Sequence, residues 1–183
     1  MDIELVPFTD QDFDELIRWS GDEHFLMQWA GPMFRYPLTR EQLFVYNQES
    51  NTAQVSDKLN YRVVLSSTHQ GIGHVSIGSI DLENRSARVT KVIVGECEYR
   101  GKGVGKALIE AVLAICFETL HLHRVTLGVF DFNTPALSAY KHVGFSIDGI
   151  LRDARKMGDS YWNLVEMSIL EDEWRALQTR KEH

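Results

Sequence analysis

The sequence is poor in cysteine and proline, and it has no long apolar run. Two cysteines and four prolines occur among 183 residues, and the seven histidines show no spacing typical of metal ligands. A disulfide framework or a Cys/His metal site is therefore not expected. No stretch reaches the roughly 18 apolar residues of a membrane-spanning helix, and an acidic start with Asp2 and Glu4 is unlike a secretory signal. We expect a soluble protein of the reducing cytoplasm, with no membrane partner and no metal.

A surplus of basic residues is also missing. The chain holds 19 Lys and Arg against 26 Asp and Glu, which gives a formal net charge of −7. Because general nucleic-acid binding requires a basic surface, we expect no nucleic-acid partner. The length suits one domain with its own core, and no linker or repeat divides the chain. We therefore expect a single domain over residues 1–183.

The spacing of apolar residues predicts a mixed α/β fold. Alternation with period two predicts strands at residues 3–8, 61–65, 72–82, 87–94, 123–130, 145–151 and 161–170. Helical spacing predicts helices at residues 11–20, 39–49, 104–120, 134–144 and 171–180, with a short helix and a loop within 22–36 and a polar loop at 51–58. Thr39 with Gln42 fits a capping box, and Thr134 fits an N-cap followed by Pro135 at the first helical position.

The order of these elements constrains the sheet. Short turns join the three strands between residues 61 and 94, which predicts an antiparallel meander. The strand–helix–strand unit over residues 87–130 needs a right-handed crossover between two parallel strands. We therefore expect a mostly antiparallel central sheet with one parallel pair. Where strands part near the crossover, their carboxyl ends open a crevice in which ligands tend to bind.

A glycine-rich loop lies between the strand predicted at residues 87–94 and the helix that follows. It reads Arg100-Gly101-Lys102-Gly103-Val104-Gly105-Lys106. Unpaired backbone N–H groups and the helix dipole make such a helix N-terminus a site for anions. Arg100, Lys102 and Lys106 add positive charge to the same segment. The loop therefore predicts a ligand that carries phosphate groups, with a simple helix-capping turn as the alternative.

Two common phosphate-binding loops do not fit this segment. A Walker A loop needs glycine where Arg100 stands and Ser or Thr where Ala107 stands, so no hydroxyl is available for magnesium. A dinucleotide fingerprint needs a third glycine where Lys106 stands, and it would be expected near the start of a Rossmann unit, not a hundred residues into the chain. Both departures argue against a protein that binds ATP or NAD.

Two segments resemble the GNAT N-acetyltransferase superfamily. The R-x-x-G-x-G pattern of Arg100, Gly103 and Gly105 is similar to the acyl-CoA pyrophosphate loop of that superfamily. The segment from Asn133 to Phe145 closely resembles its N-x-x-A-x-x-x-Y-x-x-x-G-F motif, which follows the second parallel strand. Both segments occur in the family's order, and the resemblance covers roughly residues 61–170. It implies a GNAT-type α/β fold with helices on both faces of the sheet, and an acetyl-CoA-dependent N-acetyltransferase.

The resemblance also implies how the chain is divided and how it holds acetyl-CoA, its co-substrate. Residues 1–60 would supply acceptor-side helices, residues 61–170 the acyl-CoA-binding core, and residues 171–183 a C-terminal tail. By resemblance, loop backbone holds the pyrophosphate, strand backbone pairs with the pantetheine arm, and one side chain binds the pantetheine region. The residues are, in that order, Arg100, Gly101, Lys102, Gly103, Val104, Gly105 and Lys106, then Val92, Ile93 and Val94, and then Asn133.

Tyr140 matches the tyrosine that lies beside the thioester sulfur in the family. A phenol with a reference pKa of about 10 is protonated at neutral pH and can donate its proton to the departing thiolate. Tyr140 also shares one helical stripe with Ala136, Ala139 and Val143, so the alternative role is that of a core aromatic residue. We identify Tyr140 as the candidate catalytic acid.

The group that removes the proton from the amine is left open by the sequence. An aliphatic ammonium has a pKa near about 10.4 and must lose a proton before it attacks. Glu96, just past the pantetheine-pairing strand, is the first candidate for a catalytic base, and the alternative is a solvated turn acid beside Glu98. Glu166 alternates with Trp162 and Leu164, so it either faces the cleft or pairs with a cation. An ordered water is the remaining choice.

The expected acceptor is a primary amine. Residues 149–153 with Tyr161 and Trp162 look closest to the branch of ribosomal-protein N-terminal and spermidine acetyltransferases. That resemblance implies a polyamine, another small amine or a protein N-terminus as the acceptor, and it leaves a homodimer open. Aromatic residues that either line the acceptor pocket or form core are Trp19, Phe25, Trp29, Phe34 and Tyr36. A non-catalytic module that senses acyl-CoA is the alternative function.

Overall fold

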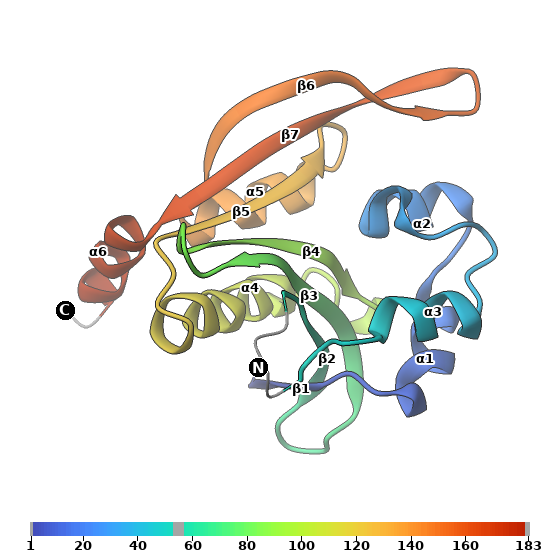
Figure 1. Ribbon diagram of the computed structural model, residues 1–183, viewed down its shortest axis with the longest axis horizontal. Helices are drawn as coiled ribbons and strands as arrows, with labels where there is room; N and C mark the ends of the chain where they lie inside the picture. The colour runs from blue at the N-terminus through green and yellow to red at the C-terminus, as the bar shows by residue number, and fades with distance from the viewer. Residues whose placement is uncertain (1, 53–56, 182–183) are drawn as a thin grey trace.

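The computed structural model describes residues 2–52 and 57–181 and builds them around one seven-stranded sheet (Figure 1). The strands are β1 (Ile3–Pro7), β2 (Leu59–Leu65), β3 (Gly71–Asp81), β4 (Ser86–Val94), β5 (Arg124–Phe130), β6 (Ser146–Met157) and β7 (Ser160–Leu170). Their order across the sheet is β1-β2-β3-β4-β5-β7-β6. Neighbouring strands are antiparallel except β4 and β5, which run parallel. The predicted sheet, with its meander and its parallel crossover, is confirmed.

The helices are α1 (Phe13–Trp19), α2 (Glu23–Ala30), α3 (Arg40–Asn47), α4 (Val104–Ala114), α5 (Thr134–Val143) and α6 (Glu171–Lys181). A π-helical turn, Ile115–Thr119, continues α4, so the helix predicted at residues 104–120 is present in two parts. The polar loop predicted at residues 51–58 includes residues 53–56, which lie outside the described residues. Within the described ranges, no helix is long and apolar enough to cross a membrane.

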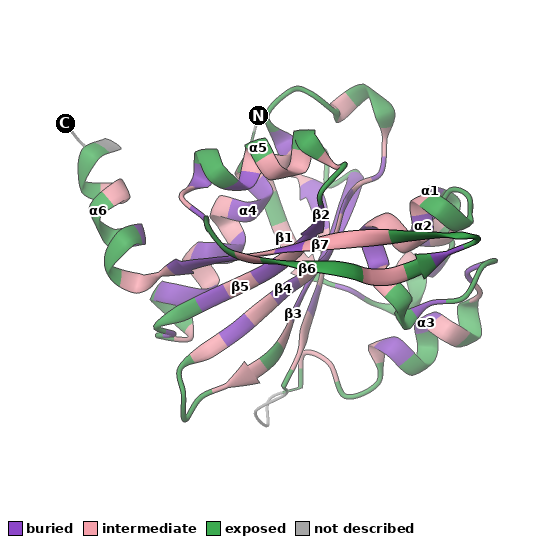
Figure 2. Cartoon of the chain, turned by 90° about the horizontal axis from the view of Figure 1, so that it is seen from above, coloured by how far each residue is buried: buried purple, intermediate pink, exposed green. Residues whose placement is uncertain are grey.

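Two hydrophobic clusters cover the two faces of the sheet. One contains Leu108 and Val112 of α4, Tyr140 of α5, and side chains from the strands. The other contains Leu16 of α1 and Leu43 of α3 together with partners from α2 and β4. Helices therefore lie on both faces, as predicted, with α1, α2 and α3 gathered beside one end of the sheet (Figure 1). Figure 2 shows buried residues along the central strands, whereas β6 is mostly exposed.

Two predicted helix caps need correction. Asn133, not Thr134, is the N-cap of α5, because the Asn133 side chain accepts a hydrogen bond from the backbone N–H of Ala136. Thr39 does cap α3, but Gln42 does not complete a capping box, because its side-chain amide bonds to the backbone of Arg35 and Pro37 instead. Since Asn is as good an N-cap as Thr, the sequence allowed either position.

β4 carries one extra residue in the middle of its ladder with β3. His74 pairs with Ile93 and Ser76 pairs with Thr90, so two steps along β3 match three steps along β4. Within this bulge Lys91 has a φ of +54°, in the left-handed region that side-chain-bearing residues rarely adopt. Because side chains alternate between the faces, the extra residue changes the face of every position that follows it. Ile93 accordingly packs in the cluster formed by α1, α2 and α3.

A neutral histidine is buried next to this bulge. His74 is 1% exposed, and its Nε2 atom lies 2.9 Å from the Tyr46 hydroxyl. No described residue offers its Nδ1 atom a hydrogen bond. Burial, and then the charge of Lys91, lower the pKa of His74 to about 3. The folded protein therefore keeps His74 uncharged, whereas the unfolded chain protonates it below its ordinary pKa of about 6.5.

The buried His74 predicts a loss of stability in mild acid. Below about pH 6.5 the unfolded state binds a proton that the folded state excludes, so the free energy of unfolding falls as the pH drops from about 6.5 toward 3. Between pH 7 and pH 5 the expected contribution is roughly 2 kcal/mol. Chemical denaturation at both pH values should show a smaller decrease for His74→Gln than for the wild type. Equal decreases would show that His74 does not titrate in this way.

Candidate functional site

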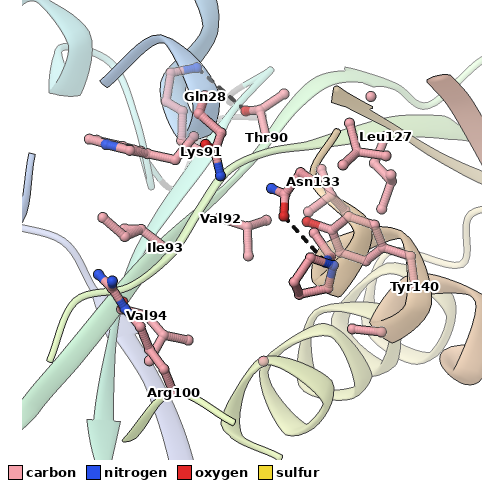
Figure 3. Close-up of a pocket in the computed structure, with 18 of the residues that line it drawn as sticks. Gln28, Thr90, Lys91, Val92, Ile93, Val94, Arg100, Leu127, Asn133 and Tyr140 are labelled. Carbon is pink, nitrogen blue, oxygen red and sulfur yellow. Dashed lines mark hydrogen bonds between the residues drawn. The ribbon is translucent and has the colours of Figure 1, made fainter. Parts of the chain in front are cut away.

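The parallel strands β4 and β5 part halfway along their length. Their ladder begins at Ser86 opposite Arg124 and ends at Val89 opposite Leu127. Beyond this point β4 continues to Val94 without pairing to β5, so one backbone edge of residues 90–94 is free of strand partners. A cavity of about 440 Å³ lies between the diverging strands and is lined by both of them, by α5, by α2 and by the start of α4 (Figure 3). The predicted crevice therefore exists at the strands' carboxyl ends.

The glycine-rich loop closes one end of this cavity. Gly101 and Gly103 have φ values of +74° and +83°, and Gly103 is the N-cap of α4. Arg100, Gly101 and Gly105 line the cavity. The loop therefore presents the N-terminus of α4, with its free N–H groups, to the cavity, as an anion would require. Other loop positions contribute less directly, since Lys102 and Lys106 are exposed and Val104 is buried in the core.

Arg100 binds the loop to the end of β4. Its guanidinium donates hydrogen bonds to the carbonyl oxygens of Val94 at 3.0 Å and Gly95 at 3.2 Å. It also lies over the ring of Phe25, 5.3 Å from the centroid. These contacts hold the loop, the strand edge and α2 together, so Arg100 positions the loop in addition to adding charge beside it.

Strand and helix residues predicted to bind the co-substrate line the same cavity. The part of β4 that does not pair with β5 contributes Val92, Ile93 and Val94. Asn133 contributes from the start of α5, where its side-chain oxygen accepts a hydrogen bond from Ala136 at 3.4 Å. The amide nitrogen at the other side of the Asn133 side chain points into the cavity (Figure 3). Its role as a cap thus leaves a hydrogen-bond donor available to a ligand.

Tyr140 combines the two roles that the sequence left open. Its ring is buried, with 9% of the residue exposed, and packs against Phe145 with centroids 6.1 Å apart. It nevertheless lines the cavity, and its hydroxyl is directed toward it (Figure 3). Within the described part of the chain the hydroxyl has no hydrogen-bond partner. Burial raises the pKa of Tyr140 to about 12, which keeps the phenol protonated and able to donate.

The two candidate bases are both engaged elsewhere. Glu96 accepts hydrogen bonds from Arg18 at 2.6 Å and from the Trp19 indole at 3.1 Å, and it lies outside the residues that line the main cavity. Glu166 accepts two hydrogen bonds from Arg88, at 2.7 and 2.8 Å. Of the two placements considered for Glu166, pairing with a cation is the one observed. This geometry does not favour either carboxylate as the base.

The structure adds residues to the site that the sequence did not indicate. Lys91 and Thr90 in the bulge and Gln28 of α2 all line the cavity (Figure 3). Alternation with Ala87, Val89 and Ile93 puts Lys91 on a buried face, whereas nothing in the sequence indicated the bulge. The five aromatic residues expected in the pocket or the core differ in their positions. Phe25 and Trp29 line the cavity, Trp19 and Phe34 are buried in the core, and Tyr36 is 53% exposed.

Comparison with known proteins agrees with this geometry. The family model described as "Acetyltransferase (GNAT) domain" matches residues 2–146. The L-amino acid N-acetyltransferase AaaT of Escherichia coli is 33% identical over 81 residues, which cover 43% of this chain and 48% of AaaT. The spermidine N(1)-acetyltransferase of Escherichia coli is 25% identical over 174 residues, which cover 95% of this chain and 89% of the relative. The putative ribosomal N-acetyltransferase YdaF of Bacillus subtilis is 30% identical over 57% of this chain and 56% of YdaF.

Solved structures share the architecture. A spermidine N-acetyltransferase from Vibrio cholerae, in complex with CoA and spermine, superposes with a TM-score of 0.80 at 23% identity over 94% of this chain and 98% of that chain. At 23% identity this match supports the fold alone. The chain spans about half the length of the first two curated relatives. The family match covers most of the chain, and the parted strands, the glycine loop and the Asn133–Phe145 segment lie within it. The chain therefore belongs to the GNAT acetyltransferase family.

Proposed function

We propose that this protein transfers the acetyl group of acetyl-CoA to the nitrogen of a primary amine. The observation that carries the proposal is the hydroxyl of Tyr140, buried yet directed into a cavity that lies between two parted parallel strands. Family membership and CoA in the solved Vibrio cholerae relative support the same reaction.

The residues present suit a bound CoA. The edge of β4 that faces away from β3 offers backbone groups of Val92 and Val94 to the amide groups of a pantetheine arm, while the Ile93 carbonyl faces β3 and the Val94 carbonyl already accepts a hydrogen bond from Arg100. The start of α4 offers N–H groups to the pyrophosphate. An added Cβ atom at Gly105 would meet no protein atom within 4 Å, so the space beside this helical turn is open to a ligand. The Asn133 amide nitrogen supplies one further donor.

Tyr140 is the acid in the proposed reaction. The neutral amine nitrogen forms a bond to the acetyl carbon, the carbon–sulfur bond breaks, and Tyr140 gives its proton to the departing thiolate. A raised pKa keeps Tyr140 protonated at neutral pH, so its hydroxyl can donate a hydrogen bond to the sulfur as negative charge develops there. The amine must lose one proton, and since Glu96 and Glu166 are both hydrogen-bonded to arginine, we assign that proton to water in the cavity, which returns a proton to the Tyr140 phenolate.

The direct test is the release of free CoA thiol from acetyl-CoA in the presence of primary amines. A panel of amino acids, polyamines, aminoglycosides and short peptides covers the acceptors of an amine acetyltransferase. We expect turnover with one class and an increase in melting temperature with CoA alone. Stabilisation by CoA without turnover of any amine would favour an acyl-CoA sensor. Neither stabilisation nor turnover would refute acyl-CoA binding altogether.

Replacing Tyr140 by Phe should lower kcat about a hundredfold, because removing a general acid typically costs this much. The affinity for CoA should stay unchanged, since the ring and its packing on Phe145 are kept. Steady-state kinetics and CoA titration measure the two quantities. Tyr61→Phe is the matched control, because Tyr61 packs against the same core but does not line the cavity. An unchanged kcat in Tyr140→Phe would remove Tyr140 from the mechanism.

Replacing Gly105 by Ala should have opposite effects on the free protein and on CoA binding. Gly105 lies in the first turn of α4 with open space at its Cβ position, so Ala should stabilise the free protein by about 0.5–1 kcal/mol. The added methyl group occupies the space proposed for the pyrophosphate, and CoA affinity should fall. Gly149→Ala, also with open space but outside the cavity, is the control. If Gly105→Ala stabilises the protein but leaves its affinity for CoA unchanged, the proposed position of the CoA site is wrong.

A further inference from the structure

A second cavity adjoins the main one on the side of the sheet hairpin. It has a volume of about 410 Å³ and is lined by the end of α2, by β4 and β5, and by residues of β6 and β7. Gln28, Trp29, Thr90 and Lys91 line both cavities, so the second opens where the acetyl donor would end. A molecule that occupies it would be placed against the reacting end of the donor, as an acceptor must be.

Among the described residues that line the second cavity, every charged residue is a cation. Arg88, Lys91 and Arg155 are among the described residues that form its wall, which includes no Asp or Glu. Glu166 neutralises Arg88 through two hydrogen bonds of 2.7 and 2.8 Å. Arg155 donates a hydrogen bond to the carbonyl oxygen of Ala154 at 2.7 Å and has no carboxylate partner in the described ranges. Arg155 therefore has no counter-charge on this wall. Lys91 lies where this cavity meets a further one of about 690 Å³, which is lined by Tyr46, Lys58, Glu41 and Asp57.

Lys91 is the more unusual of these two charges, because it is 8% exposed. Its Nζ atom lies 3.4 Å from the Thr90 hydroxyl and 5.2 Å from the centroid of the Tyr46 ring, and no carboxylate of the described chain lies within ion-pair distance. Burial, and then Lys58, lower the pKa of Lys91 to about 8, so the amine is still mostly protonated at pH 7. A buried cation without a partner is costly to the fold.

We propose that the acceptor carries a carboxylate close to its amine, as a free amino acid does, and that Lys91 and Arg155 bind this carboxylate. The inference rests on the proposed acetyl transfer and narrows its acceptor. A carboxylate would supply the counter-charge that the second cavity lacks. A polyamine in this cavity would instead bring further positive charge to Lys91 and Arg155 and would find no carboxylate on its wall, since Glu41 and Asp57 line the further cavity.

The test compares amines that differ only in the carboxylate. The wild-type protein and acetyl-CoA are incubated with a mixture of the common L-amino acids, with the corresponding amino acid amides, and with spermidine, and acetylated products are identified by mass. We expect acetylated amino acids and little acetylated amide or spermidine. For the best amino acid, kcat/KM should exceed that of its amide at least about tenfold.

Two variants then locate the carboxylate. Lys91→Met keeps the length and packing of the side chain, and it should raise KM for the amino acid about tenfold or more relative to KM for the amide. Loss of a buried unpaired charge should also raise the melting temperature of Lys91→Met by about 2–4 °C. Arg155→Met tests the same preference without touching the bulge. Lys156→Met is the control, because Lys156 neighbours Arg155 but is exposed and outside the cavity wall.

The outcomes separate this inference from the proposed function. Acetylation of amides or spermidine as fast as the matching amino acids would overturn the inference and leave acetyl transfer standing. The inference is overturned in the same way if both Lys91→Met and Arg155→Met keep the full preference for the amino acid. Acetylation of no amine at all would refute the proposed function, and the inference would fall with it.

Discussion

The extra residue in β4 is the constraint on which the site depends. At Thr90 and Lys91 the strand gains one residue over β3, and at the same point its pairing with β5 ends. The bulge bends the strand away from its parallel neighbour and leaves one backbone edge free. It also changes the faces of the following side chains, so that Ile93 joins the core of α1, α2 and α3 while Val92 and Val94 pack toward the first core. One inserted residue thus creates both the cavity and its walls.

Buried polar and charged side chains surround the bulge, whereas a protein core is usually apolar. Lys91, His74 and Tyr46 lie together, with the His74 ring held neutral and Lys91 without a carboxylate among the described residues. Such groups reduce the stability of the fold, and they persist where a ligand makes use of them. Tyr46 and Lys91 line a cavity of about 690 Å³ beside the bulge, whereas the main cavity is lined largely by strand, glycine and apolar residues together with Arg100, Asn133 and Tyr140.

Local signals in the sequence predicted the fold and many of the residues that line the main cavity. Alternation located the strands, and the crossover over residues 87–130 required the parallel pair that the structure shows. The Arg100–Gly105 loop and the Asn133–Phe145 segment indicated residues that do line one cavity. What was missed depends on distant or irregular contacts. Arg18 binds Glu96 from 78 residues away. Period-two alternation puts Lys91 on the same face as Ala87 and Val89, but the sequence carries no sign of the extra residue that places Lys91 in a bulge beside Tyr46.

In the proposed complex, the free edge of β4 pairs with the pantetheine arm of CoA. Hydrogen exchange of the backbone amides of residues 90–94, measured with and without CoA, tests it most directly. The structure predicts that CoA slows exchange in this segment and at the start of α4, and leaves β6 unchanged. CoA binding, seen as an increase in melting temperature, with no slowing of exchange in residues 90–94 would contradict the account.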